Sequence, residues 1–120
     1  MNHSDYLYMN GSKIFNFTQG NVPKLSDEIL KKNNKLKEDI NLFVFHQANK
    51  YMMDFLRKKM KIDEDRFFYF MKDVGNTVSS TIPIALIEAF RDNKIVKGDN
   101  VMLAGFGVGY SWGGTVLNFR

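Results

Sequence analysis

Residues 41–45 read NLFVF, a run with four consecutive apolar side chains, and His46 follows it directly. A strand that alternates apolar and polar residues keeps one face in water, whereas a continuously apolar strand is typical of burial on both faces. The run therefore predicts a strand in the centre of a sheet that helices cover on both sides. His46 would then lie at the carboxyl end of this strand, where open α/β sheets bind their ligands.

Two helices are predicted downstream of this strand. Residues 48–60 place apolar side chains three and four positions apart, which gives one buried and one solvated helix face. Residues 80–93 form the other helix, with Pro83 in the first turn, where proline is tolerated. The first half of this helix has almost no polar face, and a helix that is apolar all round is normally buried all round.

The remaining predicted strands come before and after these two helices in the sequence. KIFNFT at residues 13–18 reads as a strand, and the helix that follows it carries Pro23 in its first turn. Further strands are expected at residues 101–104 and 115–119, and an edge strand or packed loop at 63–72. Alternating strand and helix patterns indicate an α/β fold. We therefore expect residues 1–120 to form a single layered domain with a mixed β-sheet and helices on both faces.

The composition narrows the functional classes. The chain has 120 residues, of which 44% are hydrophobic and 25% charged, and this is typical of a folded domain that can bury a core. It has no cysteine, which excludes disulfides, thiolate metal sites and thiol nucleophiles within these residues and fits a reducing compartment. Without an apolar run of about 20 residues or a signal-peptide pattern, we expect a cytoplasmic protein that does not enter the membrane.

The net charge of +4 comes from 17 basic and 13 acidic residues, and lysines gather at residues 31–37 and 58–61. Ordinary solvated helix faces have this pattern, and so does a patch that binds an acidic protein. A nucleic-acid surface would interleave such lysines with aromatic side chains that stack on bases, which this sequence does not do. We therefore expect no nucleic-acid partner.

A glycine-rich run, AGFGVGYSWGG at residues 104–114, is the second unusual feature. It does not fit the GxGxxG pattern of a dinucleotide-binding turn in any register, and β-rich residues follow it in place of a helix. Two interpretations remain. The run forms a hairpin with a glycine-rich turn, or it forms a loop whose bare backbone N–H groups approach a substrate and stabilise an oxyanion.

Two polar side chains stand at comparable strand-to-helix junctions. His46 follows the buried strand, and Asn76 lies in GNTVSSTIP, residues 75–83, just before the apolar helix. Taken singly, a histidine of this kind is usually structural and an asparagine usually caps the helix. If both junctions and the glycine run meet in one cleft, neutral His and Asn donors beside free amides would stabilise an enolate or a tetrahedral oxyanion.

Three motifs in this order resemble one known family. HQAN at residues 46–49, GNT at 75–77 with SSTIP soon after it, and GFGVGYSWG at 105–113 resemble the carboxy-terminal half of β-ketoacyl-acyl carrier protein synthase III, a condensing enzyme with a thiolase-like fold. MNG at residues 9–11 also looks like this family, so the resemblance covers nearly the whole chain.

The resemblance implies a mechanism. Family members use a Cys, His and Asn triad, in which the Cys takes an acyl group from acyl-coenzyme A and malonyl-carrier protein then decarboxylates, so that its carbanion attacks the acyl thioester. By position, His46 and Asn76 would hydrogen-bond the malonyl thioester oxygen as it becomes an enolate. A neutral imidazole serves this role, and desolvation would keep its pKa below the working pH. No metal or other cofactor is expected, since acyl-coenzyme A and malonyl-carrier protein are substrates.

The resemblance also assigns roles within the glycine run and the helix after HQAN. The backbone N–H of Val108 would contribute to the oxyanion hole, and Gly107 and Gly109 would let it turn inward. Phe106 would line the acyl pocket. The candidate contacts to acyl carrier protein or coenzyme A are Asn49, Lys50 and Arg57.

The family's nucleophilic Cys belongs to an amino-terminal half that this sequence lacks. We therefore expect the chain to be a carboxy-terminal half that needs the missing half and is inactive alone. The apolar helix surface around Ile82, Leu86 and Ile87 would face that half, and its exposure predicts self-association into a dimer or larger oligomer. The alternative is a non-catalytic module that binds acyl carrier protein or acyl-coenzyme A through its basic helix.

Overall fold

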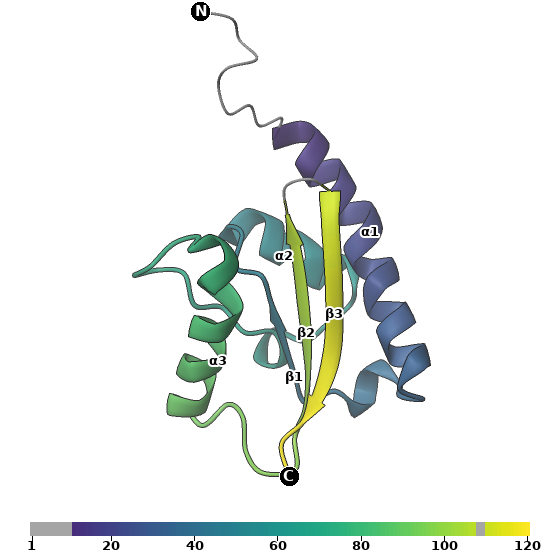
Figure 1. Cartoon of the computed structure of the whole chain (residues 1–120), viewed down its shortest axis with the longest axis vertical. Coiled ribbons are helices and arrows are strands. Elements are labelled where there is room, and N and C mark those ends of the chain that lie inside the picture. The colour runs from purple at the N-terminus through teal and green to yellow at the C-terminus, as the bar shows by residue number, and fades with distance from the viewer. Residues whose placement is uncertain (1–10, 108–109) are drawn as a thin grey trace, which may run out of the picture.

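The computed structural model describes residues 11–107 and 110–120. These residues form a three-stranded mixed sheet with helices on both of its faces (Figure 1). In chain order the elements are α1 (Gly11–Lys32), β1 (Leu42–Phe45), α2 (Lys50–Lys59), α3 (Thr81–Arg91), β2 (Asn100–Gly107) and β3 (Ser111–Asn118), with 3₁₀ turns at Lys37–Asp39, Glu64–Arg66 and Val78–Ser80. None of the described helices is both long and apolar enough to cross a membrane.

The strands lie in the order β1-β2-β3. β1 runs parallel to β2, and β2 pairs antiparallel with β3, so the predicted mixed sheet is confirmed. All four residues of β1 are buried, as its apolar run predicts. The prediction that β1 is central is wrong, because β2 has that place. Within the described residues the outer edge of β1 is covered by a packed loop, which makes one bridge between Phe43 and Phe67.

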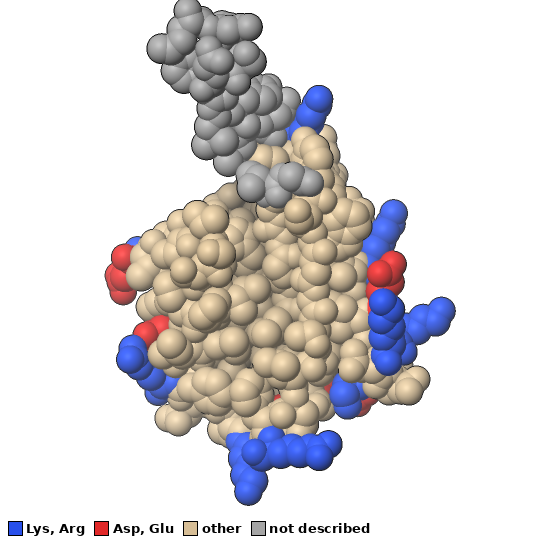
Figure 2. Space-filling model, viewed as in Figure 1, with Lys and Arg blue, Asp and Glu red and all other residues tan. Residues whose placement is uncertain are grey.

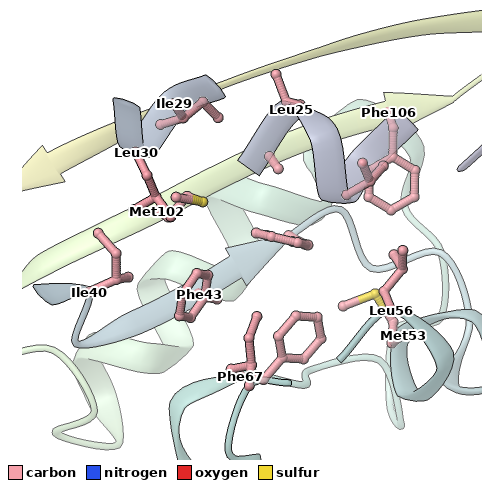
Figure 3. Packing of buried hydrophobic residues seen from close by; sticks show 14 of the residues in the cluster. Leu25, Ile29, Leu30, Ile40, Phe43, Met53, Leu56, Phe67, Met102 and Phe106 are labelled. Atoms are coloured by element: carbon pink, nitrogen blue, oxygen red, sulfur yellow. The ribbon is translucent and has the colours of Figure 1, made fainter. Parts of the chain in front are cut away.

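Side chains of the strands alternate between two cores. Phe43 and Phe45 of β1 and Met102 of β2 point to the face that α1 and α2 cover, where Figure 3 shows large apolar side chains gathered between these elements. Leu42 and Val44 point to the opposite face, which α3 covers. Because β1 is buried on both sides, it has no position at which a polar side chain would reach water.

Residues 13–18 belong to α1, so the strand predicted there is wrong. Thr18, Val22, Leu25 and Ile29 recur at helical spacing, and all four are buried. This three- and four-residue period continues through α1 and outweighs the short alternation that suggested a strand.

Pro23 lies inside α1 and not in its first turn, contrary to the prediction. A proline in a helix interior lacks the N–H that would bind the carbonyl four residues earlier, which here is that of Gln19. Nζ of Lys59 in α2 donates to the Gln19 carbonyl at 2.7 Å. A side chain of the neighbouring helix therefore supplies the hydrogen bond that the proline removes.

α3 begins at Thr81 with Pro83 in its first turn, as predicted. It is not buried all round, although its composition suggested so. Ala85 and Ala89 are fully buried, whereas Ile87 is 53% and Phe90 is 44% exposed. The small side chains of α3 face the sheet, and its large ones turn partly or wholly away from it.

The glycine run belongs to a hairpin in which β2 pairs with β3, so the hairpin interpretation is confirmed for the described residues. A Cβ at Gly114 would overlap the carbonyl oxygen of Leu103 and lie 2.7 Å from Cδ1 of Ile29 in α1. Glycine is needed there because α1 packs directly on the backbone of the hairpin. Gly113, the next residue along the strand, faces open space.

Candidate active site

A pocket of about 670 Å³ opens where β1 ends and α3 begins, and residues of α1, β2 and β3 complete its walls. Much of the wall is apolar, with Ile14, Met52, Ile82 and Trp112 among the lining residues. Five of the residues predicted for the site line this pocket, and they are His46, Asn49, Asn76, Phe106 and Gly107. The structure thus brings together the histidine, the asparagine and the glycine segment, while their catalytic roles stay predictions.

His46 is held at the end of β1 by three contacts. Its backbone N–H donates to the Ala104 carbonyl at 2.8 Å, which continues the pairing with β2 for one more residue. Its Nδ1 lies 2.6 Å from Oγ1 of Thr81, the first residue of α3. Its ring meets that of Phe106 edge to face, with the ring centroids 5.3 Å apart. The imidazole is therefore fixed from the backbone and from two sides of the ring.

Burial lowers the pKa of His46 below its ordinary value of 6.5, because removing water disfavours the charged imidazolium. The direction is the one predicted for a neutral donor. At neutral pH the ring is uncharged and carries a single N–H.

Asn76 lies in the exposed turn before α3. Its Oδ1 accepts a hydrogen bond from the Val78 N–H at 2.8 Å, which orders the 3₁₀ turn that leads into the helix. Its Nδ2 has no hydrogen-bond partner among the described residues. The carbonyl of this side chain therefore serves the local turn, and its NH₂ group is available to a ligand in the pocket.

The glycine segment reaches the pocket through Phe106 and Gly107. Phe106 is buried, and a Cβ on Gly107 would meet nothing within 4 Å. Val108 and Gly109, which were predicted to form the oxyanion hole, lie outside the described residues. Their role stays a prediction.

The three candidate carrier contacts are used differently. Asn49 lines the pocket and also begins α2, where its Oδ1 accepts from the Met52 N–H at 2.8 Å. Lys50 forms an ion pair with Asp54 at 2.6 Å, and Nη1 of Arg57 donates to the Ile62 carbonyl at 3.2 Å. Neither of these two basic residues lines the pocket.

The ion pair belongs to a small network that fixes α2 on the following loop. Oδ1 of Asp54 accepts a hydrogen bond from the Tyr69 hydroxyl at 2.8 Å. The hydrogen bonds from Lys50 and Tyr69 lower the pKa of Asp54. Burial and the Asp54 carboxylate raise the pKa of Tyr69 to about 12, so its hydroxyl remains protonated and donates.

Two polar residues of the site region were missed by the sequence analysis. Gln47 is almost completely buried; its Nε2 donates to the Phe45 carbonyl at 2.6 Å and its Oε1 accepts from the Phe70 N–H at 2.8 Å. It therefore ties the end of β1 to the loop beside it. Thr81 is the other, and the signal for it was a hydroxyl residue at the start of an otherwise apolar helix.

Within residues 11–107 and 110–120, no group of three or more His, Cys, Asp or Glu side chains is placed to hold a metal ion. What the pocket offers is hydrogen-bond donors in an apolar surrounding, which suits a ligand oxygen that carries or develops negative charge.

The layered α/β domain, with its mixed sheet and helices on both faces, has the thiolase-like class of fold. The profile of the family described as 3-oxoacyl-[acyl-carrier-protein (ACP)] synthase III C terminal matches residues 30–119. The chain belongs to this family.

Individual relatives agree with this assignment. The beta-ketoacyl-[acyl-carrier-protein] synthase III of Clostridium perfringens strain ATCC 13124 is 37% identical over 113 residues, which are 94% of this chain and 35% of that protein. A crystal structure of a 3-oxoacyl-(acyl-carrier-protein) synthase III is 47% identical and superimposes with a TM-score of 0.92 over 95% of this chain and 34% of that one. The beta-ketoacyl-[acyl carrier protein] synthase III from Thermus thermophilus is 36% identical, with a TM-score of 0.92 over 97% of this chain and 36% of that one. The chain thus spans about a third of the length of these relatives.

Proposed function

We propose that this chain supplies the His and Asn donors of a 3-oxoacyl-[acyl-carrier-protein] synthase III, which condenses an acyl group from acyl-coenzyme A with malonyl-carrier protein in fatty acid biosynthesis. The observation that carries the proposal is that His46, Asn76 and the segment of Phe106 and Gly107, far apart in the sequence, line one pocket. Neutral donors in such a pocket stabilise negative charge on oxygen without adding a charge of their own.

The proposed reaction has two steps in this pocket. The carbon–carbon bond to the malonyl carboxylate breaks, CO₂ leaves, and the electron pair moves into an enolate whose oxygen accepts hydrogen bonds from His46 and Asn76. The enolate carbon then attacks the acyl thioester on the nucleophilic Cys, a new carbon–carbon bond forms, and the Cys leaves as thiolate. Only the enolate needs the two donors in full, so they act on decarboxylation more than on acylation.

The nucleophile must come from a segment outside these 120 residues, because they contain no cysteine. We propose that this segment packs on the α3 side of the sheet and that the chain is inactive without it. In Figure 2, which has the view of Figure 1, charged side chains lie at the rim, and the centre over β2 and β3, between α3 and α1, is free of them. Ile87, Phe90 and Leu117 are exposed apolar residues of α3 and β3. An uncharged apolar face of this kind is typical of a surface that another protein segment covers.

The test is to add the missing segment as a separate polypeptide. The part of the Clostridium perfringens relative that lies outside its match to this chain would serve as that polypeptide. We expect condensation to return. His46→Ala and Asn76→Ala should each slow decarboxylation of malonyl-carrier protein by about 100-fold or more, as the loss of an oxyanion donor does, while the Cys is still acylated. Asn33→Ala, which changes an asparagine at the end of α1, should change neither step. Equal loss of both steps in the His46 and Asn76 variants would contradict the proposed roles.

Exposure of the α3 side also leads us to propose that the isolated chain self-associates. Ile87→Lys should shift the chain toward the monomer in size-exclusion chromatography with light scattering, because it places a charge on this face. Leu36→Lys changes an even more exposed apolar residue in the loop after α1 and should leave the distribution as it is. A monodisperse monomer at micromolar concentration would refute this part of the proposal.

The second candidate function is a non-catalytic module that binds acyl carrier protein or acyl-coenzyme A. The basic last turn of α2, with Arg57, Lys58 and Lys59, favours it. Carrier binding without condensation after the segment is supplied would support this alternative. The cytoplasmic location and the absence of cofactors, nucleic acid and membrane partners stay predictions.

A further inference from the structure

We propose that Thr81 is a positioning residue of this pocket. Its hydroxyl donates to Nδ1 of His46 and holds the neutral imidazole in the tautomer that carries its proton on Nε2. The catalytic consequence of this inference rests on the proposed function, in which the enolate oxygen needs a hydrogen-bond donor at Nε2. The geometry on which it stands does not depend on the reaction.

The direction of the hydrogen bond follows from the surroundings of Thr81. Oγ1 of Thr81 lies 2.6 Å from Nδ1 of His46, and the residue is only 3% exposed. Within the described residues this hydroxyl has no second partner. A buried hydroxyl proton needs an acceptor, and among the described residues the lone pair of Nδ1 is the acceptor that the structure places in reach. Nδ1 therefore accepts, and the single proton of the neutral ring sits on Nε2.

The opposite arrangement is disfavoured by the same contacts. If Nδ1 carried the proton, it would donate to Oγ1 of Thr81, and the hydroxyl proton would be buried without an acceptor. Nε2 would then be an acceptor on a residue that lines a pocket in which, on the proposed function, negative charge is to be stabilised. The lowered pKa of His46 agrees with a ring that stays neutral, for which the choice of tautomer matters.

The short segment from 76 to 81 helps to position both proposed donors, Asn76 and His46. Asn76 orders the turn Val78–Ser80 through its Oδ1, and Thr81 continues directly from that turn as the first residue of α3. The segment from 76 to 81 thus brings one donor to the pocket itself and sets the other through the ring of His46. A pocket with two donors and no acceptor at these positions selects a carbonyl or enolate oxygen over a hydroxyl group.

The experiment reads the tautomer by ¹⁵N NMR of the imidazole. The chain has two histidines, so the variant His3→Ala leaves His46 as the sole imidazole. At about pH 8, above the ordinary histidine pKa, we expect the pattern of an unprotonated Nδ1 and a protonated Nε2. Thr81→Val, which keeps the shape and removes the hydroxyl, should move the two nitrogen signals toward each other as both tautomers become populated. Thr81→Ser retains the hydroxyl and should restore the original separation.

The spectrum with unaltered Thr81 can overturn the inference by itself, even if Thr81→Val fails to fold. A protonated Nδ1 in that spectrum would overturn the inference, and so would a folded Thr81→Val variant with unchanged signals. The measurement uses no substrate, so failure of condensation after the missing segment is supplied would refute the proposed function alone. In an active complex, Thr81→Val should slow decarboxylation by about 10-fold or more, the size typical of a lost outer hydrogen bond, and Thr81→Ser should rescue it.

Discussion

The two faces of the sheet are covered in different ways. On one face, α1 and α2 pack large side chains such as Leu25, Ile29 and Leu56 onto the strands, and these are buried. On the other, α3 meets the sheet through buried Ala85 and Ala89 and partly buried Leu86, while Ile87 and Phe90 are exposed. The difference teaches that the first face buries its large side chains within the described residues, whereas the second leaves large apolar side chains exposed.

The pocket lies where these two regions meet. Ile14 and Thr18 of α1 line it from the closed side, and Thr81 and Ile82 of α3 line it from the open side. The backbone of His46 is hydrogen-bonded to β2, and its ring contacts Thr81 of α3. A partner that covers the open face would therefore also close one side of this pocket.

The largest expected effect is on the free energy of unfolding, when an isoleucine is changed to alanine on each of the two faces of the sheet. Ile29→Ala in α1 should lower the free energy of unfolding by about 2–5 kcal/mol, because it leaves a cavity in the closed core. Ile87→Ala in α3 should change that of the monomeric chain by no more than about 0.5 kcal/mol, because this side chain is 53% exposed and leaves no cavity in the core. Urea unfolding at one fixed protein concentration measures both. Similar losses for the two variants would mean that the two faces do not differ.

Adjacent glycines on opposite sides of β3 give the next test. Gly114→Ala should cost about 1–3 kcal/mol, because its Cβ would overlap the Leu103 carbonyl and press on Ile29. Gly113→Ala meets open space and should cost less than about 1 kcal/mol or be slightly stabilising. The same unfolding experiment applies. If both alanines are tolerated equally, α1 does not press on the hairpin as described.

A smaller effect is expected where α1 and α2 compensate for Pro23. Lys59→Met should lower the free energy of unfolding by about 0.5–1 kcal/mol, since the Gln19 carbonyl loses its donor. In a Pro23→Ala background this loss should vanish, because the new backbone N–H binds that carbonyl. Lys58→Met is the matched control. A loss that persists in the Pro23→Ala background would show that Lys59 acts in another way.

The smallest effect concerns His46, at the boundary of the two faces. Its pKa in the folded chain should lie below 6.5, measured by NMR titration in a His3→Ala background. Between that pKa and 6.5 the unfolded chain binds more protons than the folded one, so stability should fall as the pH drops through this window. The variant His46→Gln should lack this component. A pKa at or above 6.5 would mean that the pocket does not desolvate the ring.

Much of the fold followed from local patterns. The helices after residues 46 and 80, the mixed sheet and the hairpin were predictable because each has its own period or glycine signal. The strand at residues 13–18 was wrong because a stretch of six residues fits both a strand and a helix. The prediction that Pro23 lies in the first turn of a helix was wrong. Lys59, far away in the sequence, donates to the carbonyl that an interior proline leaves without a partner.

The candidate site was predicted in part. His46, Asn76 and Phe106 were predictable because each belongs to a motif that is visible in the sequence alone. Thr81 and Gln47 could not be given roles in this way, because a hydroxyl or a carboxamide is informative only once its partners and burial are known.

The sequence by itself determined which segments are apolar, where the helices after residues 46 and 80 lie and that His46 follows a buried strand, since these depend on neighbours a few positions apart. Tertiary structure alone decided that β2 is the central strand, that Gly114 lies beneath α1, and that the Thr81 hydroxyl meets Nδ1 of His46. The physical reason is that packing and hydrogen bonding join residues across distances in the chain that no local period records.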